Sequence, residues 1–154
     1  MEEIETASIR IRRLVESDLE AMIAIDAQGA KRRRDGYLQL KLKESLEGTG
    51  IEVSLAAEIH GSMLGFLLAR VYYGEFGALE RVAVLDTIGV HPEFHHQGIA
   101  DALMRQLRTN LAGLNIQCLR TEVSWKNQDL LAFFHHQGFN PATRLCLDLS
   151  LERP

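Results

Sequence analysis

Two periodicities divide this chain into strands and helices. Alternating apolar and polar positions, or short apolar runs, predict strands at 9–12, 51–59, 62–73, 82–90, 116–123 and 143–151. His60-Gly61 separates two of these runs and is typical of a hairpin turn. In the last run leucine occupies every second position from Leu145 to Leu151, so we expect a strand with one apolar side.

Apolar residues three or four positions apart predict the helices. The first begins near Ser17, which has the spacing of a capping box with Glu20, and the others cover about 37–47, 98–112 and 127–137. The order β-α-α-β-β-β-α-β-α-β is that of an α/β or α+β fold with a mixed sheet. In such a fold an antiparallel meander leads through a helical crossover into a parallel neighbour.

Composition places the chain among ordinary globular proteins. The length of 154 residues suits a single domain, 1–154, and 46% hydrophobic with 25% charged residues argues against disorder. A net charge of −4 gives no general reason to bind nucleic acid. The basic run 31–34 suits a solvated surface better than a polyanion site, and an acidic acceptor or partner is the alternative. The acidic N-terminus lacks the apolar core of a signal peptide, and no apolar stretch approaches the roughly 20 residues of a membrane span. We therefore expect a soluble cytoplasmic protein that binds neither nucleic acid nor membrane.

Cysteines and histidines give little sign of special chemistry. Cys118 and Cys146 lie in apolar, strand-like runs, where buried thiols are more common than a disulfide or a nucleophile. The adjacent histidines at 95–96 and 135–136 do not indicate a metal site. Neighbouring residues point in different directions, and no Cys/His spacing closes a coordination sphere, so we expect no metal.

The segment from Val90 to Ala100 is the most informative part of the chain. It joins a predicted buried strand to a predicted helix and places Gly98 in the first turn of that helix. Helix starts leave about four backbone N–H groups unpaired and carry roughly half a positive charge. Gly98 would let a phosphate approach the backbone closely, and Pro92 ends the strand. The pattern suits a bound phosphate, but a mononucleotide site or simple helix capping fits it as well.

Two motifs give this chain a family resemblance. His95-His96-Gln97-Gly98-Ile99-Ala100, after a strand ending in Val-x-Pro, resembles the signature Arg/Gln-x-x-Gly-x-Gly/Ala of the GNAT superfamily of N-acetyltransferases, with His95 at the Arg/Gln position. Asn127, followed by Phe133-Phe134-His135-His136-Gln137-Gly138-Phe139, is similar to the family's Asn…Phe-Tyr-x-x-x-Gly-Phe. The resemblance covers nearly the whole chain. It implies the GNAT fold, a mixed sheet of about six to seven strands splayed between the fourth and fifth, with about four helices.

The resemblance also implies a cofactor, acetyl-CoA. N–H groups of the turn would hold the CoA diphosphate, and the fourth strand would line the pantetheine arm through its main chain. Asn127 would bond the cofactor, although an N-cap for the following helix explains it equally. The implied cofactor-binding residues are Ile88, Gly89, Val90, His95, His96, Gln97, Gly98, Ile99, Ala100, Asn127 and Phe134.

Amine acylation by a thioester needs a neutral amine, a polarised carbonyl and a proton for the departing thiolate. Glu122 aligns with the base of the ribosomal-protein alanine N-acetyltransferases, unless it is a surface residue or is paired with Arg120 or Arg144. Asp86 on the fourth strand is a second candidate for the base. By the resemblance, the Val90 N–H would polarise the thioester carbonyl.

Phe134 occupies the position of the family's tyrosine proton donor and has no proton to give, so solvent, Tyr72 or Tyr73 would have to replace it. The prediction is an acetyl-CoA-dependent N-acyltransferase. It would act on a primary amine of a small molecule, a protein N-terminus or a lysine, by direct attack in a ternary complex. A weak or inactive acyl-CoA-binding sensor module is the alternative, and a nucleotide-binding regulatory domain is a third hypothesis. The acceptor stays unknown, and a homodimer paired through the C-terminal strand is a further expectation.

Overall fold

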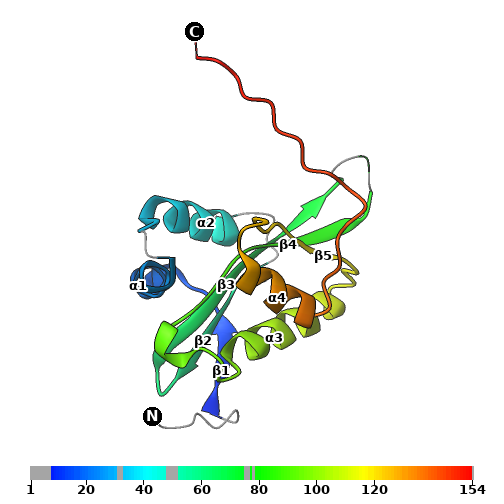
Figure 1. Ribbon diagram of the computed structural model, residues 1–154. Helices are drawn as coiled ribbons and strands as arrows, with labels where there is room; N and C mark the ends of the chain where they lie inside the picture. Colours follow the sequence, from blue (N-terminus) through cyan, green and yellow to red (C-terminus); the bar gives the residue numbers. More distant parts are fainter. Residues whose placement is uncertain (1–7, 31–32, 48–51, 75–76, 78, 154) are drawn as a thin grey trace. The chain divides into compact units, whose positions relative to one another are not determined.

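The computed structural model of this chain describes residues 8–30, 33–47, 52–74, 77 and 79–153. The chain divides into two compact units, residues 1–122 and 123–154. The first unit contains a sheet with helices on both of its faces, and the second contains one helix followed by an extended segment (Figure 1). The predicted site residues up to Glu122 lie in the first unit, and Asn127 and Phe134 lie in the second.

A five-stranded sheet in the order β1-β2-β3-β4-β5 forms the centre of the first unit. Its strands are β1 (Arg10–Arg13), β2 (Leu55–Ile59), β3 (Ser62–Tyr73), β4 (Arg81–Val90) and β5 (Leu119–Thr121). The first four pair in antiparallel fashion, and β4 and β5 pair in parallel. The expected mixed sheet, with a meander leading into a parallel neighbour, is therefore confirmed.

The predicted hairpin turn joins β2 to β3. His60 has φ 50° and Gly61 has φ 80°, the pair of positive angles that a two-residue type I′ turn requires. Because this turn matches the natural twist of the flanking strands, it fixes their antiparallel register at Ile59↔Ser62. The short sequence His60-Gly61 was thus sufficient to locate the hairpin.

Two helices cover one face of the sheet and a third covers the other (Figure 1). On one side lie α1 (Leu19–Ala30) and α2 (Asp35–Glu47), and on the other lies α3 (Ile99–Gly113). The first interface is a fully apolar cluster of Leu14, Met22, Ile25, Leu38, Leu42, Ala56, Phe66 and Leu68. On the opposite face α3 approaches so closely that a Cβ at Gly65 would lie 2.8 Å from Ile99 Cγ2.

The start of α1 differs from the predicted capping box. A short 3₁₀ turn, Glu16–Asp18, leads into the helix, and the Asp18 carboxylate accepts a hydrogen bond of 2.8 Å from the Val15 N–H. Asp18 is also held by a two-point contact with the Arg12 guanidinium, at 2.8 Å for each bond. Asp18 therefore closes the 3₁₀ turn that precedes α1, in place of the predicted capping box of Ser17 with Glu20. A partner on β1 decides this, and local spacing does not report such a partner.

The second unit is built around α4 (Gln128–His136). The helix ends as the sequence predicted, with Gly138 at φ 94° and the Phe139 N–H donating to the Phe134 carbonyl at 3.0 Å. This turn brings the Phe139 ring back to 5.0 Å from the Phe134 ring. The contact is the hydrophobic clasp that commonly accompanies such a helix end.

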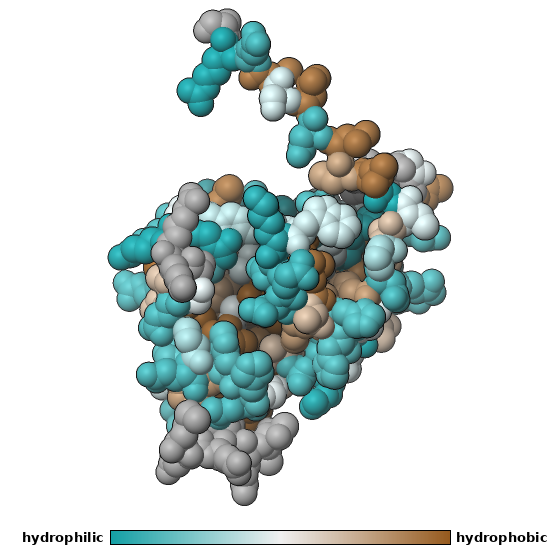
Figure 2. All heavy atoms as spheres, viewed as in Figure 1, coloured by the Kyte–Doolittle hydropathy of each residue, from teal (hydrophilic) through white to brown (hydrophobic). Residues whose placement is uncertain are grey.

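The predicted strand at 143–151 is wrong for this structure. Among the described residues the segment pairs with no strand, so the sheet has five strands rather than six or seven. Leu145, Leu147, Leu149 and Leu151 have relative exposures between 83% and 88%. Figure 2 shows hydrophobic residues in brown along this extended segment, which Figure 1 draws in red. An alternating pattern shows that a segment could form a strand. It does not show that another strand with unpaired backbone groups lies beside the segment.

Burial of the cysteines is a second expectation that the structure overturns. Cys118 and Cys146 are both free and exposed. Cys118 precedes the short strand β5, and Cys146 lies on the unpaired C-terminal segment, so neither reaches the sheet interior that its apolar neighbours suggested. Within the described ranges, no helix is both long and apolar enough to cross a membrane.

Candidate functional site

The sheet opens between β4 and β5. The parallel pairing runs from Ala83↔Leu119 to Leu85↔Thr121, where the Thr121 hydroxyl also donates to the Leu85 carbonyl at 2.9 Å. Beyond that point β4 continues to Val90 and pairs with β3 alone among the described strands. The expected splay between the fourth and fifth strands is therefore present, and it leaves one edge of β4 open.

The main-chain groups of Ile88 and Val90 face this open edge. The His91 N–H donates to the Leu64 carbonyl at 2.8 Å, and Gly89 pairs with Phe66, so both residues direct their main chain toward β3. Since alternate residues of a strand direct these groups to opposite edges, Ile88 and Val90 direct theirs into the opening. An amide-rich arm lying along this edge would find hydrogen-bonding partners there.

A 3₁₀ turn, Pro92–Phe94, leads from β4 toward α3. His91 Nδ1 accepts a hydrogen bond from the Glu93 N–H at 3.2 Å, which stabilises the start of the turn. The His95 ring lies back against β4, with Nε2 2.9 Å from the Val90 carbonyl oxygen. Because a carbonyl can only accept, this ring nitrogen carries the proton. His95 therefore closes the turn onto the open strand edge.

The backbone N–H groups at the start of α3 have no acceptor among the described residues. Gly98 precedes the helix at φ 85°, and His96 also has a positive φ, 61°. The amides of residues 96–100 donate to no acceptor among the described residues. A Cβ added at Gly98 would meet nothing within 4 Å, so the space above the turn is open. Unpaired N–H groups, the helix dipole and open space together fit a diphosphate, and the residues present therefore suit CoA.

Gln97 adds one acceptor to this region of donors. Its Oε1 atom is the one buried side-chain oxygen or nitrogen without a partner in the described part of the chain. A buried acceptor in this state costs free energy until a donor reaches it. A phosphate cannot serve, but an amide N–H of a pantetheine arm or a water molecule can.

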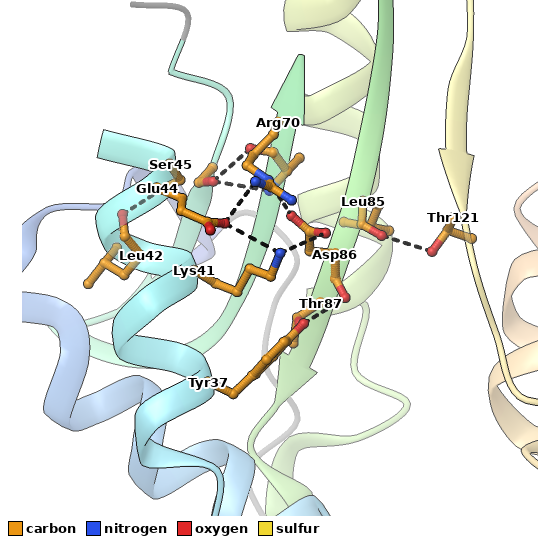
Figure 3. Close-up of polar contacts among 12 residues, drawn as sticks. Tyr37, Lys41, Leu42, Glu44, Ser45, Arg70, Leu85, Asp86, Thr87 and Thr121 are labelled. Carbon is orange, nitrogen blue, oxygen red and sulfur yellow. Dashed lines mark hydrogen bonds and ion pairs between the residues drawn. The ribbon is translucent and has the colours of Figure 1, made fainter. Parts of the chain in front are cut away.

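Asp86 lies in a β-bulge and is held by two cations (Figure 3). Its Oδ2 accepts from Arg70 Nε at 2.9 Å, and its Oδ1 lies 3.7 Å from Lys41 Nζ. Glu44 completes the cluster, 2.7 Å from Arg70 Nη1 and 3.4 Å from Lys41 Nζ. Burial acts to lower the pKa of Arg70, but the hydrogen bond and charge of Asp86, with the charge of Glu44, raise it above its usual value.

Glu122 has none of these constraints. It follows β5 by one residue, is exposed, and forms no hydrogen bond or ion pair with any described residue of the first unit, Arg120 included. No cation of the described first unit lies against its carboxylate, whereas both oxygens of Asp86 contact cations. Of the two candidate bases, Glu122 alone lacks a cation partner among the described residues of the first unit, so a substrate proton would not have to displace an ion pair there.

Asn127 and Phe134 belong to the second unit. Asn127 caps α4, because its Oδ1 accepts a hydrogen bond from the Leu130 N–H at 3.2 Å. That contact leaves the Nδ2 donors of the side chain without an acceptor among the described residues. Phe134 is buried and packs against the rings of Phe133 and Phe139. Its phenyl group has no proton to transfer.

Sequence reasoning missed the groups that α2 directs at β4. Tyr37 and Lys41 were assigned only to a helix, yet they contact Thr87 and Asp86 (Figure 3). They are four residues apart, about one helical turn, so they lie on the same side of α2. This spacing is the one feature of the sequence that could have indicated that both contact the same strand. Tyr73, considered earlier as a proton source, is 70% exposed on β3. Within the described ranges no group of His, Cys, Asp and Glu could hold a metal ion.

The sequence matches the acetyltransferase (GNAT) family over residues 14–139. A similar solved structure is the aminoglycoside 6′-N-acetyltransferase of Acinetobacter baumannii, with 21% identity, coverage of 94% of this chain and 99% of that one, and a TM-score of 0.76. An aminoglycoside N-acetyltransferase in complex with CoA has 20% identity, coverage of 92% and 94%, and a TM-score of 0.74. The ribosomal-protein-S18-alanine N-acetyltransferase of Escherichia coli has 24% identity, coverage of 88% and 79%, and a TM-score of 0.71.

At these identities the solved structures show a shared fold, and the family match carries the chemistry. That match includes β2 to β5, the turn with its unpaired amides, and the second motif up to Phe139. The splayed β4 edge and the open start of α3 lie within it and suit the cofactor of this family. The chain therefore belongs to the acetyltransferase (GNAT) family, as an enzyme that transfers an acetyl group from acetyl-CoA to an amine.

Proposed function

We propose that acetyl-CoA is held almost entirely by main-chain groups of the first unit. The amides of residues 96–100 receive the diphosphate, and Ile88 pairs with the pantetheine arm, while Val90 has its N–H left for the acyl end because His95 already contacts its carbonyl. His95, Gln97 and Ala100 form the walls of the same turn. The observation that carries this assignment is the start of α3, where Gly98 is left-handed and its neighbouring amides have no acceptor among the described residues. When bound, the cofactor supplies an activated acetyl group, and the Val90 N–H would polarise its carbonyl.

Glu122 is the general base of this proposal. A lysine with pKa about 10.4 must lose a proton before it attacks, at a cost of roughly 4 kcal/mol near pH 7.4. For an α-amine with pKa about 7.8 the same cost is only a few tenths of a kcal/mol. A free carboxylate is therefore more valuable for a lysine-like acceptor, and the unpaired state of Glu122 supports that role. Asp86 would instead stabilise the bulge through Arg70 and Lys41.

An acceptor screen that follows release of the CoA thiol tests the activity. The panel should contain aminoglycosides and peptide N-termini, because similar folds act on these two kinds of amine, together with polyamines and lysine peptides. Glu122→Gln should lower turnover about a hundredfold with a lysine-like amine and less with an α-amine. Glu20→Gln, which neutralises an exposed carboxylate on α1, is the matched control. Equal turnover of Glu122→Gln and the parent would exclude this base.

Phe134 favours one second candidate function. Because this side chain cannot donate a proton, a module that binds acetyl-CoA and reports its presence, with weak or no transfer, is the alternative. Both functions predict acetyl-CoA binding, but only the enzyme releases thiol in the presence of an amine. Tight binding without turnover across the whole acceptor panel would select the sensor.

The exposed C-terminal segment suits pairing with a second copy of the chain. Leu145, Leu147, Leu149 and Leu151 form one apolar side, and a monomer would leave them in water. We expect residues 1–154 to act as one domain that dimerises through this segment. The exposed free cysteines further fit a reducing cytoplasm. Sedimentation equilibrium should give a dimer for the parent and a monomer for Leu147→Asp. A parent that stays monomeric at all concentrations would contradict this pairing.

A further inference from the structure

The bulge in β4 directs two consecutive side chains toward α2. Leu68 pairs with Thr87 and Ala69 pairs with Leu85, so Asp86 is the extra residue. In a regular strand consecutive side chains point to opposite faces, and a bulge relaxes this rule. Both Asp86 and Thr87 consequently contact residues of α2. The bulge also lies between the last β4–β5 pair, at Leu85, and the first residue of the open edge, Ile88.

Tyr37 of α2 reaches this point with its hydroxyl. The Tyr37 oxygen lies 2.7 Å from Thr87 Oγ1 and 3.4 Å from the Asp86 carbonyl oxygen (Figure 3). Its ring packs against the apolar cluster between the helices and the sheet, and the Arg34 guanidinium lies 5.0 Å from the ring centroid. Arg34 is itself fixed by Asp26, with Nε 2.9 Å from Oδ2. The phenol is therefore held by its ring and by its hydroxyl.

The ion cluster stabilises the same arrangement from the next turn of α2. Lys41 and Glu44 pair with Asp86 and Arg70, so α2 is joined to β3 and β4 on the far side of Tyr37 from Arg34. These pairs are partly or largely buried, which limits their screening by solvent. The Tyr37 hydroxyl consequently has a defined position beside the bulge, as general acid catalysis requires.

We propose that Tyr37 is the proton donor of the acetyl transfer, with Thr87 as its positioning residue. The inference rests on the proposed function, since it places the thioester on the open edge that begins at Ile88. As the acceptor nitrogen bonds to the acetyl carbon and the C–S bond breaks, the electron pair of that bond stays on sulfur. Sulfur then takes the Tyr37 hydroxyl proton. The acceptor nitrogen loses one proton to Glu122, and that proton returns through water to the phenolate, so no net proton is gained or lost by the enzyme.

Thr87 donates its hydroxyl hydrogen to the Tyr37 oxygen in this arrangement. The contact of 2.7 Å allows either atom to donate, and donation by Thr87 leaves the Tyr37 hydrogen on its long bond of 3.4 Å to the Asp86 carbonyl, which sulfur would replace as the acceptor. The bond from Thr87 stabilises the phenolate while it waits for its proton. Thr87→Ser keeps this donor and Thr87→Val removes it, which separates the hydroxyl from the shape of the side chain.

Steady-state kinetics provide the first test. Tyr37→Phe keeps the ring and removes the hydroxyl, so kcat should fall by at least about tenfold while the KM for acetyl-CoA stays unchanged. Thr87→Val should show a smaller loss of kcat that Thr87→Ser restores. Tyr73→Phe, on the exposed end of β3, is the matched control and should retain full turnover. Full turnover of Tyr37→Phe would overturn the proposal, as would a loss confined to KM.

A second readout does not depend on turnover. With ¹³C-labelled tyrosine, the Tyr37 ring signal is identified by its absence in Tyr37→Phe. CoA should shift this signal more than desulfo-CoA does, because only CoA presents sulfur to the hydroxyl. Equal shifts would place Tyr37 away from the thiol and end the inference. If no amine is acetylated but CoA alone shifts the signal, the proposed function fails while the contact between Tyr37 and sulfur stands.

Discussion

The chain contains the tetrapeptide His-His-Gln-Gly twice, at 95–98 and at 135–138, with opposite consequences. The first copy precedes α3 and the second closes α4. In both, the glycine is left-handed, with φ 85° at Gly98 and 94° at Gly138. The same letters and the same glycine conformation therefore begin one helix and end another.

The amide groups explain the difference. At the second copy the N–H groups of Gln137, Gly138 and Phe139 donate to carbonyls of the preceding helical turn, at 3.0 Å each. At the first copy the amides of residues 96–100 have no acceptor within the described part of the chain. A helix end uses its last amides to satisfy its own carbonyls, whereas a helix start leaves amides free for a ligand. Binding capacity thus comes from position along the helix, not from the tetrapeptide.

Gly98→Val should produce the largest effect on this comparison. A branched side chain at this position occupies the open space above the turn, where a diphosphate must approach the amides. We expect the affinity for acetyl-CoA to fall at least about tenfold, or roughly 1.4 kcal/mol, beyond the strain of a positive φ. Isothermal calorimetry at a temperature where the variant is folded measures the change. Unchanged affinity would remove the diphosphate from the start of α3.

Gly138→Val should shift stability and leave affinity alone. A side chain at φ 94° costs about 1–2 kcal/mol in the left-handed region, and no ligand is expected at this turn. The midpoint of urea denaturation should fall accordingly, with acetyl-CoA affinity unchanged in calorimetry. A drop in affinity similar to that of Gly98→Val would mean that both copies contact the cofactor, and the comparison would fail.

Local patterns were sufficient where the determining contacts are local. The turn at His60-Gly61 and the glycine end of α4 depend on neighbouring residues, and the sequence predicted both. Contacts between distant residues escaped it. Asp18 closes the turn before α1 with its carboxylate held by Arg12, and Asp86 is occupied because Arg70 and Lys41 lie beside it.

The predicted site follows the same division. Gly98 and its neighbours could be assigned to a phosphate site from a strand, a turn and a helix in succession. The first N–H groups of any helix have no partner within the helix, so donors are present there whatever the sequence. Tyr37 could not be assigned in this way, because α2 and the β4 bulge are distant in sequence and meet only in the folded sheet. The segment 143–151 failed for a related reason. Its pattern required a partner edge that the chain's described residues do not supply.

The 3₁₀ turn before α1 offers a third case, in which the Asp18 carboxylate accepts the Val15 N–H, whereas the amides before α3 have no acceptor among the described residues. Asp18→Asn should lower the free energy of unfolding by about 1 kcal/mol at neutral pH. Burial alone would raise the pKa of Asp18, but the hydrogen bonds from Arg12 and from the Val15 N–H lower it below its ordinary value. The stabilisation is therefore present above about pH 4 and is lost as the pH falls through the lowered pKa. Urea denaturation of both proteins between pH 7 and pH 2 should show curves that converge at acid pH. A constant gap would contradict the ion pair.

Asn127 at the start of α4 should give the smallest effect, and it decides whether a capped helix start can also contact the cofactor. Its Oδ1 is used by the Leu130 N–H, so any bond to acetyl-CoA must come from Nδ2. Asn127→Ala removes the cap and should cost about 0.5–1 kcal/mol of stability. Asn127→Asp keeps the cap acceptor and loses the Nδ2 donor, so it should unfold like the parent but bind acetyl-CoA more weakly. If Asn127→Asp binds with parental affinity in calorimetry, this asparagine is a cap alone, and the open start of α3 becomes the sole helix start assigned to the cofactor.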